Sequence, residues 1–241
     1  AGNDQTLQFT KDVLDEIMDI FPSEYIHIGG DECPKSRWEK CPKCQAKIKE
    51  LGIKALPKHS KENQLQTYFM SELEKEINAH GRRMLGWDEV LEGGLTPNSI
   101  MSWRGIQGGI EAARQHHDVI MTPIQRLYFS NPRINKMTGF EWMNRVYNFE
   151  PVPAELTDAE KKFVIGTQGC IWTEWTADST KMEWQILPRM AALSEIQWTL
   201  PEHKNFERFM ERLPEMLKIY SSLDYGYRED VFAADTLKTH K

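Results

Sequence analysis

Two adjacent carboxylates, Asp31 and Glu32, directly follow a short apolar run and two glycines. A positioned carboxyl group can give or take a proton during a reaction. Ordinary retaining glycosidases place a nucleophile and an acid/base about 5 Å apart, on opposite sides of the scissile bond. Adjacent residues seldom reach that arrangement, because they leave neighbouring points of one backbone. Gly29 and Gly30 would let the chain turn so that both acids enter one pocket.

The pair suits a mechanism in which the substrate supplies its own nucleophile. The 2-acetamido group of a sugar can attack the anomeric carbon and form an oxazolinium ion, and one carboxylate then holds the amide N–H. The neighbouring carboxyl protonates the leaving oxygen and later activates water. Substrate assistance is a known exception to the two-carboxylate rule. A helix-capping Asp followed by a surface Glu remains the alternative, so the pair alone is weak evidence.

Acids and large aromatic residues also follow the other apolar runs. They are Trp87-Asp88-Glu89, Trp103-Arg104-Gly105, Tyr128 and Trp172-Thr173-Glu174-Trp175. In parallel α/β folds the reactive groups lie at the carboxyl ends of strands. Indole rings stack well on the apolar faces of sugars, and their collection at one end of a sheet favours a sugar-cleaving pocket over simple core packing.

The elements that would position these residues alternate between helix and strand. Buried strands are predicted at 25–28, 83–87, 99–103, 118–121 and 163–167. The first helix is predicted to begin at a cap on Asn3 or Asp4 and to end before Pro22, and the second is predicted at about 65–77 with Gly81 as its stop. Further helices are predicted at about 108–115, 188–198 and 206–220, the last with a kink at Pro214. The alternation predicts a parallel sheet with helical crossovers. Five strands cannot close an eight-stranded barrel, so the pattern allows either an open doubly wound sheet or a piece of a barrel.

Composition excludes some classes of protein. A formal net charge of -6 argues against nucleic-acid binding, which needs a basic surface. No apolar run approaches the roughly 18 residues of a membrane-spanning helix. The chain does not start with a basic segment followed by an apolar one, so no signal peptide is predicted within it.

His27-Ile28-Gly29-Gly30-Asp31-Glu32 resembles the signature of family-20 glycoside hydrolases, the β-N-acetylhexosaminidases. Further motifs resemble the same family in the same order. They are Gly86-Trp87-Asp88-Glu89, Ser102-Trp103-Arg104-Gly105, Gly169-Cys170-Ile171-Trp172-Thr173-Glu174, and Pro188-Arg189 followed by Ser194-Glu195. The resemblance extends from about Asn3 to Tyr220 and implies a TIM (β/α)8 barrel. The chain would supply about the fourth to eighth βα units, so residues 1–241 would form one partial catalytic barrel domain.

The resemblance implies an exo-acting retaining hydrolase that removes terminal β-linked N-acetylglucosamine or N-acetylgalactosamine. Asp31 would orient the acetamido group, and Glu32 would be the general acid/base. Tyr128 would donate a hydrogen bond to the acetamido carbonyl, and Glu174 would bind the terminal hydroxyls. The pocket walls would come from Trp87, Trp103 and Trp172, and an outer wall from Trp142, in the long loop after Tyr128. His27 would support the site from behind or be an ordinary core histidine.

The implied partner is a glycan or glycoconjugate with a terminal β-linked N-acetylhexosamine, and no cofactor is implied. The resemblance also suggests a periplasmic or extracellular location. Ser130 departs from the family, which commonly has an Asp two residues after this tyrosine. The first three strands and a sugar-binding arginine are also absent from the chain. We therefore expect a truncated catalytic domain that could form a homo-oligomer, with an inactive sugar-binding fragment as the alternative.

The four cysteines allow three states. Cys41-Pro42-Lys43-Cys44 has the spacing of a zinc knuckle, and Cys33 lies nearby. A complete zinc site would need a further ligand from a distance, such as His59 or Cys170. A disulfide within this loop is the second option if the protein is exported. Free cysteines are the outcome that we expect, and no metal is predicted.

Overall fold

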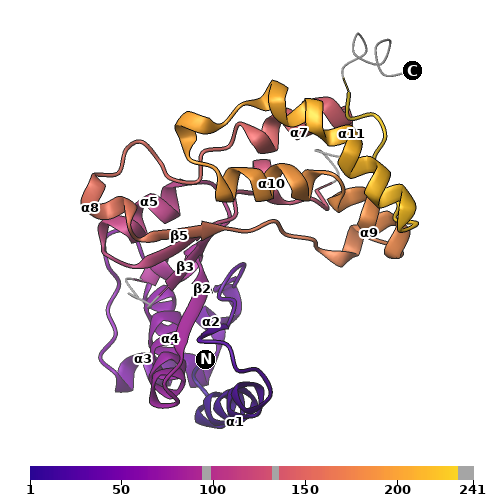
Figure 1. Ribbon diagram of the computed structural model, residues 1–241. Coiled ribbons are helices and arrows are strands. Elements are labelled where there is room, and N and C mark those ends of the chain that lie inside the picture. Colours follow the sequence, from indigo (N-terminus) through magenta and orange to yellow (C-terminus); the bar gives the residue numbers. More distant parts are fainter. Residues whose placement is uncertain (94–98, 132–135, 233–241) are drawn as a thin grey trace. The chain divides into compact units, whose positions relative to one another are not determined.

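The computed structural model describes residues 1–93, 99–131 and 136–232, and the chain divides into two compact units (Figure 1). The first unit comprises Ala1–Ile120 and Glu155–Ile165. The second comprises Met121–Ala154 and Gly166–Lys241. The prediction of one partial barrel domain across 1–241 stays a prediction.

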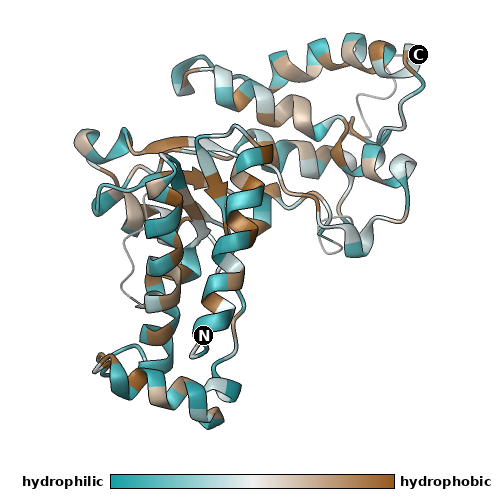
Figure 2. Cartoon of the chain, turned by 90° about the horizontal axis from the view of Figure 1, so that it is seen from below, coloured by the Kyte–Doolittle hydropathy of each residue, from teal (hydrophilic) through white to brown (hydrophobic). Residues whose placement is uncertain are grey.

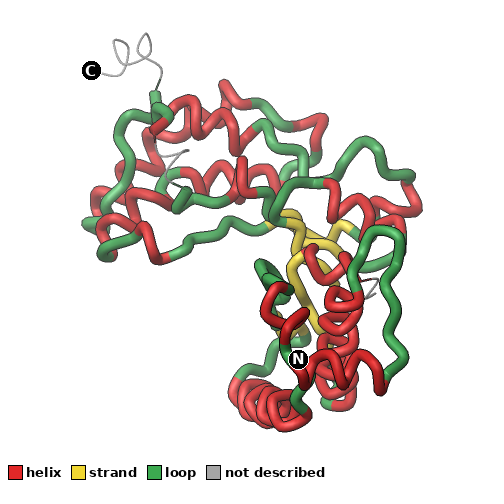
Figure 3. Tube along the Cα trace, turned by 180° about the vertical axis from the view of Figure 1, so that it is seen from behind, coloured by secondary structure: helices red, strands yellow, loops and turns green. Residues whose placement is uncertain are grey.

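The described residues form a sheet of five strands in the order β1-β2-β3-β4-β5, drawn in yellow in Figure 3. The strands are β1 (Tyr25–His27), β2 (Arg83–Trp87), β3 (Ser99–Ser102), β4 (Asp118–Met121) and β5 (Val164–Thr167). β1 and β2 pair in parallel with Tyr25 opposite Arg83, and β2 and β3 do so with Leu85 opposite Ser99. Sequential order with parallel pairing is what helical crossovers produce in a barrel. All five predicted strands are confirmed.

Helices cover the sheet of the first unit. They are α1 (Asp4–Ile20), α2 (Ser36–Lys40), α3 (Pro42–Glu50), α4 (Lys61–Ala79), the 3₁₀ helix η1 (Asp88–Gly93), α5 (Gln107–Arg114) and α8 (Asp158–Lys161). α4 packs on β2 and η1, and α1 packs on α4. Ser60 caps α4 by accepting the backbone N–H of Asn63 at 3.2 Å. Gly81, predicted to end α4, follows it with a positive φ of 69°.

The strands of this unit are largely apolar, whereas the helices expose polar faces, as the brown strands and teal helix surfaces of Figure 2 show. Every residue of β3 is buried, and so is every residue of β2 after Arg83. Strands buried in this way are typical of a parallel sheet covered on both faces. The apolar stripe of α1 is only partly covered, because Leu14 and Met18 are buried while Phe21 is 55% exposed.

The second unit is mainly helical. It contains α6 (Ile124–Leu127), α7 (Gly139–Tyr147), α9 (Ser179–Ile186), α10 (Arg189–Trp198) and α11 (Phe206–Ser222), with 3₁₀ turns η3 (Thr173–Trp175) and η4 (Pro201–His203). α7 packs on α10. The core of this unit is built from Met143 and Val146 of α7, Leu193 of α10 and Leu213 of α11, all of which are buried. α11 continues through Pro214.

α7 was not predicted from the sequence, which suggested a long loop after Tyr128. Its signal is a capping box, in which the Thr138 hydroxyl accepts the Glu141 backbone N–H at 3.2 Å and Glu141 accepts the Thr138 N–H at 2.9 Å. Thr followed three residues later by Glu is a recognised helix start. The motif stands just before an apolar run and therefore could have been found.

All four cysteines are unpaired in the structure, with Cys44 and Cys170 buried. Burial raises the pKa of the Cys170 thiol to about 11. Hydrogen bonds from the backbone and thiol of Cys44 hold the pKa of Cys41 below its ordinary value. Within the described ranges, no cysteine belongs to a group of three close metal-ligating atoms. The geometry therefore supports neither the zinc knuckle nor the disulfide.

Candidate active site

The loop that follows β1 has an unusual backbone. Gly29 and Gly30 have φ values of 75° and 104°, and Glu32 has a φ of 45°. A side chain on Gly30 would collide with Val90 of η1, so glycine is required there for space as well as for conformation. The Gly29 carbonyl accepts the Trp87 backbone N–H at 3.0 Å. The sequence after β1 therefore packs closely on the segment that follows β2.

Asp31 and Glu32 are both exposed and leave this loop in succession. The Asp31 carboxylate lies near Gly29, where an added Cβ would be 3.7 Å from Oδ1. Its charge also acts on His27: the surrounding protein lowers the pKa of His27, and Asp31 partly offsets this. Glu32 instead lines a cavity. The two acids thus share a loop but contact different neighbours.

The cavity beside Glu32 has a volume of about 350 Å³, in the range of small-molecule sites. Its lining comes from the β1–α2 loop, α4, η1 and the segment after β3, and comprises Gly30, Glu32, Cys33, Pro34, Lys35, Gln66, Glu89, Glu92 and Arg104. The loop is held by side chains of this lining. Gln66 donates to the Gly30 carbonyl at 2.8 Å, and Lys35 donates to the Cys33 carbonyl at 2.6 Å.

Glu89, which follows β2, is the buried acid of this site. One oxygen, Oε2, accepts the Trp103 indole N–H at 2.7 Å, and the other, Oε1, accepts the Glu32 backbone N–H at 3.2 Å and pairs with Arg104. Arg104 also pairs with Glu92 at 3.0 Å. The sequence placed Glu89 after a strand but gave it no role. Its partners come from two other strand ends, and no local pattern reveals them.

Trp87 and Trp103 lie together in the first unit, as predicted for neighbouring strand ends. The Trp87 ring is 4.8 Å from the His27 ring and 6.5 Å from the Trp103 ring, both in edge-on geometry. Trp87 is 7% exposed. Its indole supports His27 and Trp103 and presents little free surface.

In the second unit, Tyr128 and Trp172 lie side by side with ring centroids 6.0 Å apart. A parallel bridge joins Tyr128 to Cys170, and the Phe129 N–H donates to the Cys170 carbonyl at 2.8 Å. Ser130, the departure from the family pattern, accepts the Trp172 backbone N–H on its hydroxyl at 2.9 Å. The serine therefore holds the Trp172 backbone, and Trp172 keeps 41% of its surface exposed. Glu174 lies two residues further, exposed in η3.

Trp142 differs from its predicted role. It lies on α7 and is 1% exposed. Its ring packs edge-on to Phe129 at 6.1 Å and directly against the buried Arg189 guanidinium. A side chain enclosed by protein does not contact a sugar, so this burial argues against an outer subsite wall. The expectation came from taking the segment as a loop, in which the indole could have faced solvent.

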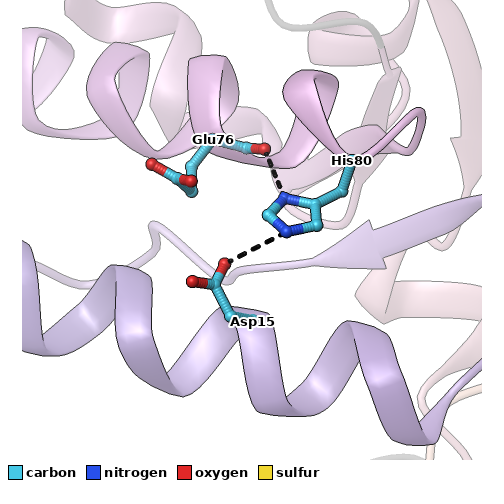
Figure 4. A group of neighbouring side chains, drawn as sticks. All are labelled: Asp15, Glu76 and His80. Carbon is cyan, nitrogen blue, oxygen red and sulfur yellow. Dashed lines mark hydrogen bonds and ion pairs between the residues drawn. The ribbon is translucent and has the colours of Figure 1, made fainter.

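A group of three potential metal ligands lies elsewhere in the first unit. Asp15 of α1 faces Glu76 and His80 at the end of α4, with His80 Nε2 3.7 Å from Asp15 Oδ1 (Figure 4). Lys11 pairs with Glu76 at 3.1 Å, and His80 Nδ1 lies 3.0 Å from the Glu76 carbonyl. Gln66, which contacts the cavity loop, lies ten residues before Glu76 on α4. This separation is about 15 Å along the helix axis. The group belongs to the α1–α4 contact and stands apart from the cavity.

The described strands lie in sequential order with parallel pairing from β1 to β3, and acids or large aromatic residues follow them, as in a barrel-type α/β fold. The chain belongs to glycosyl hydrolase family 20, whose catalytic domain matches residues 1–201.

Three relatives illustrate the relationship. The beta-hexosaminidase of Porphyromonas gingivalis is 41% identical over 221 residues, which are 88% of this chain and 28% of that protein. The family-20 exo β-N-acetylglucosaminidase of Vibrio harveyi, solved with N-acetylglucosamine, superposes with a TM-score of 0.79 at 31% identity, over 92% of this chain and 36% of its own. A β-N-acetylhexosaminidase from Bacteroides fragilis gives a TM-score of 0.75 at 25% identity, over 96% and 48%. The chain thus spans less than half of each relative, and the predicted partial TIM barrel is confirmed.

No described helix combines the length and the apolar character that a membrane crossing needs.

Proposed function

We propose that the chain provides the acid/base and acetamido-orienting part of an exo-acting β-N-acetylhexosaminidase. The substrate would be a glycan with a terminal β-linked N-acetylglucosamine or N-acetylgalactosamine. The observation that carries the proposal is the loop after β1, on which Asp31 and Glu32 follow two glycines with positive φ. Glu32 lines a cavity of about 350 Å³ there, and Asp31 lies near His27.

In this proposal the reaction proceeds in two steps with net retention. The acetamido oxygen bonds to the anomeric carbon while the bond to the leaving oxygen breaks, and the Glu32 carboxyl gives its proton to that oxygen. Asp31 accepts a hydrogen bond from the acetamido N–H and offsets the positive charge of the oxazolinium ion. Water, deprotonated by Glu32, then attacks the anomeric carbon and restores the acetamido group. Two inversions at one carbon give retention.

Other roles rest on the order of the family motifs. Trp103 and Trp172 would contact the sugar, and Tyr128 would hydrogen-bond the acetamido carbonyl. Glu174, which is exposed, would bind the terminal hydroxyls. Trp87 would act mainly by supporting Trp103 and His27, because only 7% of its surface is exposed.

Replacement of Glu32 by Gln tests the assignment. Because the amide cannot transfer a proton to the leaving group, hydrolysis of a β-linked N-acetylglucosamine disaccharide should fall by about 10²–10⁴-fold, the usual contribution of a general acid/base. Binding of N-acetylglucosamine, measured by calorimetry, should persist. The matched control is Glu39→Gln, an exposed acid of α2. Unchanged turnover in Glu32→Gln would remove this residue from the role, and equal rates on a plain β-glucoside would contradict substrate assistance.

A sugar-binding chain without turnover is the second candidate. It is favoured by coverage, because the chain spans 28% of the Porphyromonas relative and 36% of the Vibrio structure. Sugar binding without hydrolysis by the wild-type chain would select it. A periplasmic or extracellular location also belongs to the proposal, on the strength of the family resemblance, and cell fractionation tests it.

A further inference from the structure

We propose that Glu89 is a positioning residue that fixes Glu32 and the Trp103 indole relative to each other. The inference rests on the proposed function, since it assigns Glu89 to the support of the acid/base. Glu89 is 6% exposed, and each of its carboxylate oxygens accepts a hydrogen bond from one of these two residues.

The contact to Glu32 acts on a strained backbone. Glu32 has a φ of 45°, in the left-handed region that residues other than glycine rarely adopt. Such conformations persist only where the surrounding structure holds them, and they concentrate at functional sites. Glu89 Oε1 accepts the Glu32 backbone N–H at 3.2 Å, across 57 residues of sequence. This bond orients the peptide that aims the Glu32 side chain at the cavity.

The contact to Trp103 ties the second residue to the same carboxylate. Trp103 Nε1 donates to Glu89 Oε2 at 2.7 Å, a short bond to a charged acceptor. Arg104 pairs with the other oxygen and supplies the positive charge that a buried carboxylate needs. The loop after β1 and the segment after β3 therefore meet at one carboxylate that follows β2.

The chemistry of the carboxylate is essential to this arrangement. Glutamine has the same size but only one acceptor oxygen, and its NH₂ group is a donor. In Glu89→Gln either the Glu32 N–H or the Trp103 N–H would face another donor, so one of the two would move. Glu89→Asp keeps the charge for Arg104 but draws the oxygens back by one methylene group. The control is Glu111→Gln, an exposed acid of α5 that does not line the cavity.

A dependence on the leaving group separates positioning from a general loss of structure. p-Nitrophenol leaves readily without a proton, whereas the sugar leaving group of a β-linked N-acetylglucosamine disaccharide requires one from Glu32. A misdirected acid should therefore reduce kcat on the disaccharide about tenfold more than on the nitrophenyl substrate, a fraction of the full general-acid effect. Glu111→Gln should leave the ratio of the two rates unchanged. A Glu89→Gln enzyme with equal losses on both substrates would overturn the proposal.

A second measurement is independent of activity. In ¹⁵N-labelled chain the Trp103 indole N–H resonance can be identified by its loss in Trp103→Phe. It should shift in Glu89→Gln and Glu89→Asp and stay in place in Glu111→Gln. If wild-type chain turned over neither substrate, the proposed function would fail for this chain, while the resonance would still decide whether Glu89 holds Trp103. An unmoved resonance in a folded Glu89 variant would refute the positioning role.

Discussion

Asp88, next to Glu89, is a partly buried acid. Burial raises the pKa of Asp88 to about 6, and the charge of Glu89 adds to the rise. The Ser102 hydroxyl, which lies 2.7 Å from the Gly105 carbonyl and 3.3 Å from Asp88 Oδ2, acts in the opposite direction, as do the charge of Arg104 and the Trp103 backbone N–H. Burial and the charge of Glu89 outweigh these contacts, so the net effect favours the neutral acid.

We expect Asp88→Asn to change the pH dependence of stability. The pKa is higher in the folded chain than the ordinary 3.8. The stabilising contribution is therefore complete below about pH 4 and is lost as the pH rises through about 6. Relative to Asp88→Asn, the wild type should lose at most about 3 kcal/mol of unfolding free energy from pH 4 to pH 7. Urea unfolding at several pH values measures this, with the exposed Asp19→Asn as control. If the plots of unfolding free energy against pH stay parallel for wild type and Asp88→Asn, this prediction is wrong.

Side-chain partners could be predicted only where sequence places them at the same strand end. Asp31 and Glu32 stand out because glycines precede them after an apolar run. The role of Glu89 could not be predicted, since its partners Trp103 and Glu32 lie 14 and 57 residues away. Trp142 was misplaced for the same reason, because its burial depends on Arg189 packing from another helix.

At the scale of elements, Gly30 links β1 to η1. It has a φ of 104°, and an added methyl group would meet Val90 and lie 3.1 Å from Met70 Cε. Gly29 also has positive φ, but the atom nearest to a methyl group added there would be Asp31 Oδ1, at 3.7 Å. Comparing substitutions at the two glycines therefore distinguishes the cost of a strained backbone, which both would have, from the cost of steric crowding, which arises at Gly30.

We expect Gly30→Ala to destabilise the chain more than Gly29→Ala. Gly29→Ala should cost about 1 kcal/mol, the penalty of a left-handed backbone with a Cβ. Gly30→Ala adds overpacking against η1 and α4, which typically costs about 1–3 kcal/mol more. Chemical denaturation measures both values. Equal losses of unfolding free energy in the two variants would show that η1 moves enough to make room for the methyl group at Gly30.

Elements could be predicted well where an apolar period is continuous. The strands at 83–87 and 118–121 have the predicted bounds. The helices α10 and α11 each begin within one residue of the start predicted for them. Short helices such as α2 have too few turns to show a period, and α7 depended on its capping box. At this scale the apolar pattern predicts most of the elements, whereas it could not choose between an open doubly wound sheet and a piece of a barrel.

At the scale of the whole chain, uncovered apolar surface is the notable feature. One stripe of α1 is exposed over three turns, with Phe9 at 67%, Val13 at 43%, Ile17 at 36% and Ile20 at 67%. These positions follow helical spacing and adjoin the buried Leu14, which packs inward. Contiguous apolar surface of this kind marks an interaction site or promotes aggregation.

We therefore expect the chain, purified by itself, to self-associate through α1. Burying the stripe against a second copy would remove apolar side chains from water, each worth about 1.5–3 kcal/mol when fully covered. Size-exclusion chromatography with light scattering should give a mass above 28.1 kDa that falls on dilution. Phe9→Ser combined with Ile20→Ser should shift the mass toward the monomer, while Gln8→Ser combined with Asp19→Ser, two exposed positions on the polar side of α1, should not. A wild-type chain that stays monomeric at every concentration would show that the apolar stripe of α1 remains exposed to solvent without driving association, which would contradict the prediction.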